Sequence, residues 1–439
     1  MPSAGVLAVA GATLTLAVAN ALAAPPFTGN DEAAHVAYAL AIADGRLPTV
    51  SDRSTASPIG PLVPGRLIYT ANHPPLYYAL VGPPMAGLAD AGHPGAALRL
   101  ARLANAVFAT LAVLATAAIA ARLAPGRRRV PILAAAVAGL VPAYTFVAGF
   151  AYNDGLALAA AAGLLAAALA VHQDGATSRR LVLVGLLAAA AALARISALP
   201  AVAAAAVLVA TGRGRRRDAL APLLSALVGA GWFYARNEYR YGDLTGGRYL
   251  YDLLDREPRM SVAGALVDHG FWSAMAADAW GRFAPLPGPL ELLLGIAALA
   301  CIVWQLRRPT VAWAVLAAYA LVVVVAVARF YAQGGGAHGR YLYPLLAVAG
   351  PAVGIVAARF RIASAVAVVL AVLYGVRHLH GVLARYVHTP QRGWARIEDA
   401  ALAQAGVPLH AGVLVLLAAA LLGCTALVVR ELLARPATS

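Results

Sequence analysis

Asn30-Asp31-Glu32-Ala33-Ala34-His35 follows shortly after the first apolar segment of the chain, residues 4–24. That segment is long enough to cross a membrane. It ends in Ala21-Leu22-Ala23, which imitates a signal-peptidase site, but it lacks a basic beginning, so we expect a retained helix. Two adjacent carboxylates beside a membrane are costly unless water or a function accounts for them. The stretch therefore predicts a membrane helix that opens into an acidic, functional loop.

The composition is that of an all-α polytopic membrane protein. The 439 residues are 62% hydrophobic and 12% charged, with a mean hydropathy of +0.75, whereas soluble domains have about 25% charged residues. The net charge of +15 comes from arginines in short clusters between apolar segments, which is typical of topology signals and argues against nucleic-acid binding. Cys301 and Cys424 lie in apolar runs and suggest neither a metal site nor a disulfide.

Apolar segments of spanning length predict about twelve transmembrane helices, at residues 4–24, 97–121, 130–150, 155–172, 181–195, 197–211, 219–236, 290–306, 310–329, 341–358, 362–379 and 410–430. Residues 181–211 are ambiguous because one long helix is the alternative. Arg195, Ser197 and Pro200 interrupt this stretch, and a single helix would put its flanking arginine clusters on opposite sides of the membrane. We therefore predict a hairpin of two short helices.

Alternate short loops carry most of the arginines, which predicts that these loops and both termini are cytoplasmic. We expect a single membrane domain, residues 1–439, with long extracytoplasmic loops at 25–96, 237–289 and 380–409. Loops of this length usually carry function. All 34 basic residues are arginine, a bias typical of GC-rich genomes, so we expect the plasma membrane of a bacterium.

The acidic stretch predicts an interfacial helix, which Asn30 would cap and which would end near Asp44. Asp31, His35 and Tyr38 share one face of it at i, i+4 and i+7. The alternative is that the acids merely complement the helix dipole.

Four further motifs follow in order, the first within the predicted loop 25–96 and the other three at the ends of predicted membrane helices. They are His73-Pro74-Pro75-Leu76-Tyr77-Tyr78, Tyr152-Asn153-Asp154, the run from Trp232 to Asp243, and His338-Gly339-Arg340-Tyr341-Leu342-Tyr343-Pro344. With the acidic stretch, they resemble the GT-C glycosyltransferases, in the branch of protein O-mannosyltransferases, aminoarabinose transferases and bacterial relatives that use polyprenyl-phosphate sugars. The resemblance covers about residues 1–350.

The resemblance implies a GT-C-like fold with interfacial helices in the first outside loop, and an inverting transfer of a sugar from a polyprenyl phosphate to a hydroxyl. It implies that Asp31 is the catalytic base, with Glu32 as the alternative. The departing phosphate needs positive charge. The candidates for binding the substrate and its phosphate are His73, Arg66, Arg195, Arg340, Tyr341, Asp154, Asn153 and Tyr77.

Several candidates have a structural alternative. The aminoarabinose branch has Lys where this chain has His73, and a histidine is charged only part of the time near neutral pH. Arg340 at a helix end is also explained by snorkelling. Arg195 is also explained by pairing with a backbone carbonyl, and Asp154 by helix capping.

We expect no cofactor. The alternative is a divalent metal held by Asp31, His35 and a distant histidine such as His269 or His338, but this spacing fits no zinc pattern. The expected partners are the lipid-linked donor, membrane lipid and a glycan, lipid or protein acceptor. A transporter or lipid flippase is the main alternative, since twelve helices suit one, although ionisable residues here gather at the outer face. A membrane scaffold would leave the ordered motifs unexplained.

Overall fold

The computed structural model describes residues 2–29, 31–55, 65–213, 216–281, 283–307, 310–386 and 411–434, together with Ile59 and Ala395. The regular structure of these residues is helical, and Arg53 and Leu67 form an isolated antiparallel bridge. The helices are, in chain order, α1 (Ala4–Ala23), α2 (Glu32–Ala43), η1 (Tyr69–Asn72), α3 (Leu76–Asp90), α4 (Pro94–Leu123), α5 (Arg129–Gly139), α6 (Pro142–Ala148), α7 (Asp154–Asp174), α8 (Ser178–Ala194), η2 (Ile196–Ala198), α9 (Leu199–Ala210), η3 (Arg216–Ala219), α10 (Leu220–Tyr241), α11 (Gly247–Leu253), α12 (Val262–Val267), α13 (His269–Trp280), α14 (Gly288–Leu306), α15 (Val311–Ala332), η4 (Gly339–Leu345), α16 (Leu346–Ala357), α17 (Arg361–Tyr386) and α19 (Ala411–Leu433).

The chain is a multi-pass membrane protein. Among the described residues, nine helices are long and apolar enough to cross a membrane, and α5 with α6 makes a tenth if the bent pair is one span. Each of the twelve predicted segments coincides with a helix or helix pair. Because α8 and α9 are shorter than 18 residues, the count of twelve stays a prediction.

The predicted helix at 130–150 is two helices rather than one. α5 and α6 meet at an angle of 67°. Val141 between them has φ −68° and ψ 120°, and Pro142 begins α6. A residue before proline is driven out of the helical region by the proline ring, so the sequence Val141-Pro142 ends α5.

The α8–α9 pair forms the predicted hairpin. Arg195, between the two helices, reaches back to the beginning of α7, where its Nη1 lies 2.7 Å from Asp154 Oδ1. After α9, the backbone N–H of Arg213 donates to the carbonyl of His172 near the end of α7 at 3.2 Å. α8 therefore runs back along α7 and α9 returns beside it, so the arginines at the beginning of α8 and after α9 lie at the same end of the bundle.

The helix bundle has an arginine-rich end opposite Asp154. There Arg122 Nη1 lies 2.5 Å from Asp174 Oδ2, joining the last turns of α4 and α7. Arg129 Nη2 donates to the carbonyl of Ala434, after α19, at 2.6 Å. Arg122 and Arg129, which were predicted to share one side of the membrane, thus lie at the same end of the bundle.

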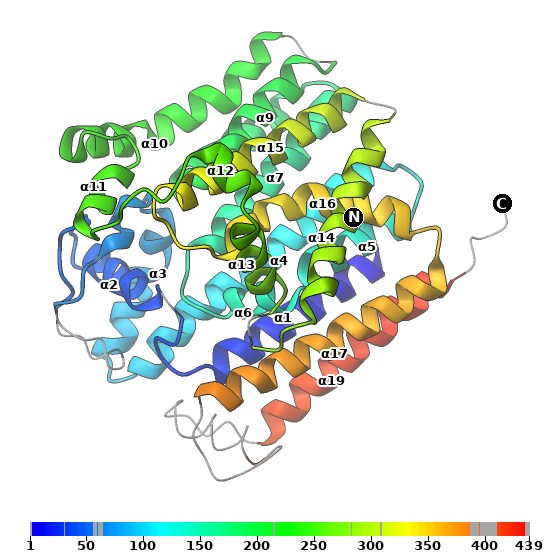
Figure 1. Cartoon of the computed structure of the whole chain (residues 1–439), viewed down its shortest axis with the longest axis horizontal. Helices are drawn as coiled ribbons and strands as arrows, with labels where there is room; N and C mark the ends of the chain where they lie inside the picture. The colour runs from blue at the N-terminus through cyan, green and yellow to red at the C-terminus, as the bar shows by residue number, and fades with distance from the viewer. Residues whose placement is uncertain are drawn as a thin grey trace.

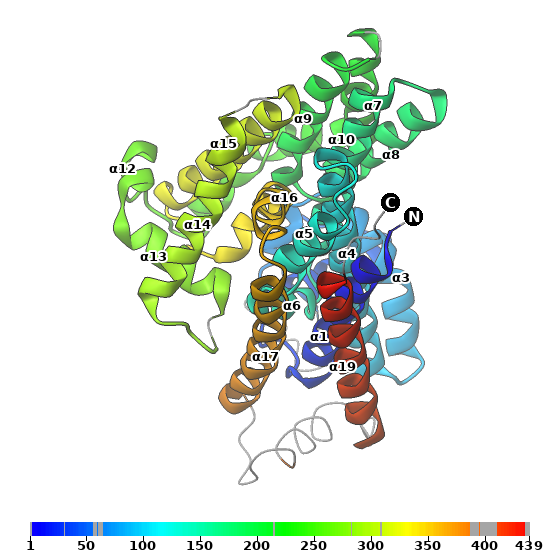
Figure 2. The same ribbon diagram turned by 90° about the vertical axis from the view of Figure 1, so that its right-hand side faces the viewer.

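Helices from the two ends of the chain pack together. α1 runs beside α19, and α19 beside α17 (Figures 1 and 2). The loop helices α2 and α3 lie at the opposite edge of the molecule in Figure 1. They pack closely: Tyr38 of α2 stacks on Tyr78 of α3 with ring centres 3.8 Å apart. α3 also packs against α4, so the segment between α1 and α4 is folded onto the bundle.

The loop helices differ in detail from the sequence expectations. Asn30 lies outside the described residues, and α2 begins at Glu32 with Asp31 before it. Within the predicted loop 237–289, residues 262–280 form two helices, α12 and α13, with Asp268 between them. In the predicted loop 380–409, residues 380–386 still belong to α17, and the rest lies outside the described residues except Ala395.

Gly155 of α7 lies at a close approach between α4 and α7. A Cβ atom there would lie 2.4 Å from Asn105 Oδ1 and 2.9 Å from the backbone nitrogen of Ala109, both in α4. We expect Gly155→Ala to force α4 and α7 apart and to lower the free energy of unfolding by about 1–3 kcal/mol. Gly163→Ala in the same helix meets only Leu187 at 3.4 Å and should leave the protein as stable or up to about 1 kcal/mol more stable. Thermal unfolding in detergent measures both; equal effects would contradict the close approach.

Candidate active site

Asp31 lies at the beginning of α2, but its carboxylate does not cap that helix in the described structure. Tyr69 Oη donates to Asp31 Oδ1 at 2.8 Å, and Arg340 Nη2 pairs with Asp31 Oδ2. The Asp31 side chain is 23% exposed and that of Arg340 only 8%. The acidic stretch is thus explained by a tertiary ion pair and not by helix capping.

The ion pair sets the protonation of Asp31. Burial alone would raise the pKa of the Asp31 carboxyl, but the neighbouring Arg340 guanidinium and the Tyr69 hydrogen bond hold it well below its usual range. The carboxylate is therefore ionised, and a carboxylate held in this way is a weak proton acceptor.

Arg340 and Arg195 share an aromatic partner. The guanidinium carbon of Arg340 lies 5.0 Å from the centre of the Tyr152 ring and 5.3 Å from that of Tyr341. The guanidinium carbon of Arg195 lies 5.9 Å from the same Tyr341 ring. Arg195 also donates to Asn153 Oδ1 at 3.2 Å and pairs with Asp154. Two arginines, from the α8–α9 hairpin and from η4, therefore converge on one ring.

His73 contacts the site through the ring of His35, which lies one helical turn after Asp31 in α2. Its ring stacks 6.2 Å from that of His35, and His35 Nδ1 lies 2.8 Å from Tyr78 Oη. Burial lowers the pKa of His35 to about 3 and that of His73 well below its ordinary value, where the charge of Arg195 lowers it further. His73 is thus neutral and offers a hydrogen bond, not the positive charge expected from the sequence.

Glu32 has a different environment from Asp31. It is fully buried and forms a two-pronged ion pair with Arg102, with distances of 2.7 Å and 2.8 Å. Its oxygens also accept the backbone N–H groups of Phe27 at 2.9 Å and Ala151 at 3.0 Å. Arg102 in turn donates to the carbonyl of Ala24 at 2.6 Å. Both Glu32 oxygens already accept hydrogen bonds, and the ion pair holds the beginning of α2 against α4. Asp31 is therefore the better candidate for a base.

Two predicted residues lie apart from this group. Arg66 is exposed on the loop that leads to Tyr69, where its charge acts on the Tyr69 hydroxyl. Tyr77 is 1% exposed, and its hydroxyl donates to the carbonyl of Ala101 in α4 at 2.9 Å. Tyr77 therefore links α3 to α4, whereas Arg66 lies on the exposed segment that precedes Tyr69.

Sequence reasoning missed Tyr69 and Arg102, and it gave Tyr152 no role although this residue begins the motif Tyr152-Asn153-Asp154. Arg102 had a usable signal, since an arginine inside a predicted membrane segment demands a partner. Tyr69 had none, because a tyrosine near a membrane surface is common and its partner is fixed only by the fold.

Polar atoms without partners gather at the site. Within the described part of the chain, four buried atoms here lack a hydrogen-bond partner: Arg340 Nε, Asp154 Oδ2, His73 Nδ1 and Tyr343 Oη. Native interiors leave few polar groups unpaired. The cluster therefore indicates a place that receives a polar ligand.

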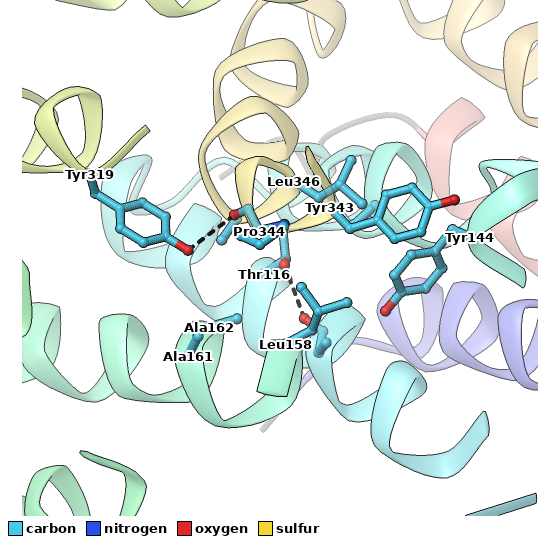
Figure 3. A pocket seen from close by; sticks show the side chains of 12 residues that line it. Thr116, Tyr144, Leu158, Ala161, Ala162, Tyr319, Tyr343, Pro344 and Leu346 are labelled. Carbon is cyan, nitrogen blue, oxygen red and sulfur yellow. Dashed lines mark hydrogen bonds between the residues drawn. The ribbon is translucent and has the colours of Figure 1, made fainter. Parts of the chain in front are cut away.

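A small cavity is bordered by Asp154, Tyr144 and Tyr343. A second cavity shares Tyr144 and Tyr343 with the first and is also lined by Tyr319 (Figure 3). Both linings are mostly apolar, and Asp154 is the charged residue that borders the first cavity.

No group of three histidine, cysteine or acidic side chains suited to a metal occurs in the part of the chain that the structure describes. His35 Nδ1, which would have joined Asp31 at a metal, is bonded to Tyr78 instead. The expectation of no cofactor stays a prediction.

Neither a protein-family model nor a curated protein matches this sequence. Solved structures do match. ArnT from Cupriavidus metallidurans bound to undecaprenyl phosphate has a TM-score of 0.54 at 17% identity, with 98% of this chain and 78% of that chain covered. Its apo state has a TM-score of 0.52 at 16% identity, covering 97% and 74%. The chain therefore shares the fold of ArnT over nearly its whole length.

This result confirms the fold that the motif resemblance implied. The archaeal oligosaccharyltransferase AglB from Archaeoglobus fulgidus, in complex with an inhibitory peptide and a dolichol-phosphate, is also similar. It has a TM-score of 0.48 at 14% identity, over 97% of this chain and 56% of that one.

The two acids of the first loop should respond differently to neutralisation. Glu32→Gln leaves the buried Arg102 charge unpaired, so we expect a loss of about 3–5 kcal/mol in the free energy of unfolding. Asp31→Asn should cost only about 1 kcal/mol, because Asp31 is partly exposed and the amide oxygen still accepts a hydrogen bond. Comparing thermal unfolding of the two variants in detergent tests this, and an equal or larger loss in Asp31→Asn would contradict the assignment.

Proposed function

We propose that this protein is a membrane glycosyltransferase that moves a sugar from a polyprenyl-phosphate donor to an acceptor hydroxyl, with inversion. The observation that carries the proposal is the pairing of Asp31 with Arg340 beside a cluster of unpaired buried polar atoms. The ordered motifs and the fold of ArnT support it. The acceptor is a glycan, a lipid or a protein.

The two arginines suit a lipid phosphate. Arg340 has an unpaired, buried Nε beside the Nη2 that holds Asp31. An arginine that presents two donors side by side binds phosphate oxygens in a two-pronged manner. Arg195 approaches from the other side of Tyr341. In the proposal both stabilise the negative charge that develops on the departing phosphate.

Asp31 serves as the base. The acceptor oxygen attacks the anomeric carbon and forms the new C–O bond while its proton passes to the Asp31 carboxylate. The bond from that carbon to the phosphate oxygen breaks, and its electron pair leaves with the lipid phosphate. Inversion needs the base and the leaving phosphate on opposite faces of the sugar, so the proposal requires Arg340 to leave Asp31 when it takes the phosphate.

The phosphate and Asp31 compete for Arg340. In this structure Arg340 Nη2 is occupied by Asp31. A donor phosphate that takes over this arginine releases Asp31 and lets its pKa rise toward the ordinary range. Donor binding thereby activates the base, and free enzyme has little capacity to deprotonate an acceptor.

The proposal puts the reaction on the extracytoplasmic face of a bacterial plasma membrane, with both termini in the cytoplasm. Membrane lipid surrounds the apolar helices. A lipid flippase would also bind the phosphate but would need no base, so the fate of the sugar separates the two functions.

Transfer should depend on Asp31. We expect purified protein in detergent, given polyprenyl-phosphate mannose or arabinose and envelope extract, to release polyprenyl phosphate and to label an acceptor. Asp31→Asn should reduce the rate at least about 100-fold, since a general base contributes a factor of about 10²–10⁴. Asp44→Asn, at the exposed end of the same helix, is the matched control. Full activity in Asp31→Asn would overturn the base assignment, and comparing envelope glycans of cells with and without the gene identifies the sugar.

Binding of undecaprenyl phosphate should change in opposite directions in two variants. Asp31→Asn removes the competitor for Arg340 and a repelling charge, so we expect roughly tenfold tighter binding. Arg340→Ala should weaken it by a similar factor or more. Titration in detergent, monitored by protein fluorescence, measures both. Unchanged affinity in Arg340→Ala would leave Arg340 as a snorkelling residue, and weaker binding in Asp31→Asn would contradict the competition.

A further inference from the structure

We propose that Asp278, in the second outside loop, is a positioning residue that fixes Arg340 by capping η4 from the neighbouring helix α13. This inference rests on the proposed function for its consequence, because Arg340 is the residue assigned there to the lipid phosphate. Asp278 belongs to none of the motifs that resemble the glycosyltransferases, and the sequence gives no reason to select it.

The contact is direct. The backbone N–H of Gly339, the first residue of η4, donates to Asp278 Oδ2 at 2.8 Å. The first N–H groups of a helix have no partner within the helix, and His338, which precedes η4, supplies no side-chain cap in the described structure. A bond to a carboxylate is stronger than one to a neutral acceptor. Asp278 therefore fixes the point at which η4 begins, one residue before Arg340.

The close packing of α13 on η4 makes this contact specific. A Cβ atom on Gly339 would lie 2.2 Å from the backbone nitrogen of Ala279 and 2.7 Å from the carbonyl carbon of Asp278. Only glycine permits this approach. The glycine of the Gly339-Arg340 motif is thus explained by α13, whose backbone lies against the beginning of η4.

A 3₁₀-helix does not hold its own position well, because its hydrogen bonds have poor geometry. η4 has seven residues and contains Pro344, which further reduces its backbone hydrogen bonding. The Arg340 guanidinium must nevertheless meet Asp31 from the first loop. An external restraint at Gly339 therefore has a direct effect on where Arg340 points.

α13 is itself anchored at its other end. Asp268 caps it, accepting the backbone N–H of Phe271 at 2.8 Å, and Tyr331 at the end of α15 donates to the same carboxylate at 3.4 Å. The helix lies across the middle of the molecule in Figure 1. His338 Nδ1 lies 3.9 Å from Asp278 Oδ2, so a protonated His338 would reinforce the same contact.

The test compares three variants in the full-length protein in detergent. Asp278→Ala removes the cap, Asp278→Asn keeps an acceptor for Gly339, and Asp268→Ala disturbs the same helix without touching η4. We expect Asp278→Ala to weaken binding of undecaprenyl phosphate by about 10- to 100-fold, since small misplacements of a binding group have effects of this order. The other two variants should stay within about threefold of the unmodified protein.

Hydrogen exchange at the Gly339 amide provides the second readout. It should be at least about tenfold faster in Asp278→Ala than in Asp268→Ala, because only the former removes its acceptor. Unchanged exchange in Asp278→Ala, or equal losses of affinity in Asp278→Ala and Asp268→Ala, would overturn the inference. Failure of the proposed function can be told apart from failure of this inference. In the former case the unmodified protein transfers no sugar, whatever the hydrogen-exchange rates of the Gly339 amide.

Discussion

The ion pair between Asp31 and Arg340 joins residues 309 positions apart in the chain, and the surrounding structure serves to bring them together. Glu32 and Arg102 hold the beginning of α2 against α4, and this contact orients the side chain of the adjacent Asp31. Asp278 binds the beginning of η4, and this contact orients the side chain of Arg340. The pair therefore depends on two separate supports, one on each side, and neither support takes part in the proposed chemistry.

A buried ion pair is an uncertain source of stability, because the desolvation of both charges offsets much of their attraction. The two ion pairs of the first loop differ in how fully their charges are satisfied. Glu32–Arg102 is fully buried, and each oxygen of the Glu32 carboxylate accepts two hydrogen bonds, so this pair stabilises the fold. Asp31 is partly exposed and Arg340 keeps an unpaired donor. That second pair can exchange one anion for another at small cost, as a substrate site requires.

The sequence was sufficient for features fixed by local pattern. The arginine clusters around residues 181–211 required a hairpin, and the motifs pointed to Asp31, Asp154 and Arg340, which the fold connects through Arg195 and Tyr341. Side-chain partners were not predictable, because Tyr69 meets Asp31 only after the first loop has folded back on α2. The bend at Val141 was missed for another reason: residues 130–150 are uniformly apolar, and hydropathy masks the effect of Pro142 on the helix.

The replacement of the expected lysine by His73 changes how the positive charge of the site is supplied. A buried histidine beside Arg195 stays neutral, so the structure compensates with guanidinium groups on two different elements. Arginine does not lose its charge on burial as lysine does, and its fork favours a phosphate over a single carboxylate oxygen. In the proposal, the lipid phosphate therefore takes Arg340 from Asp31 at a site whose positive charge comes from two arginines and not from a lysine.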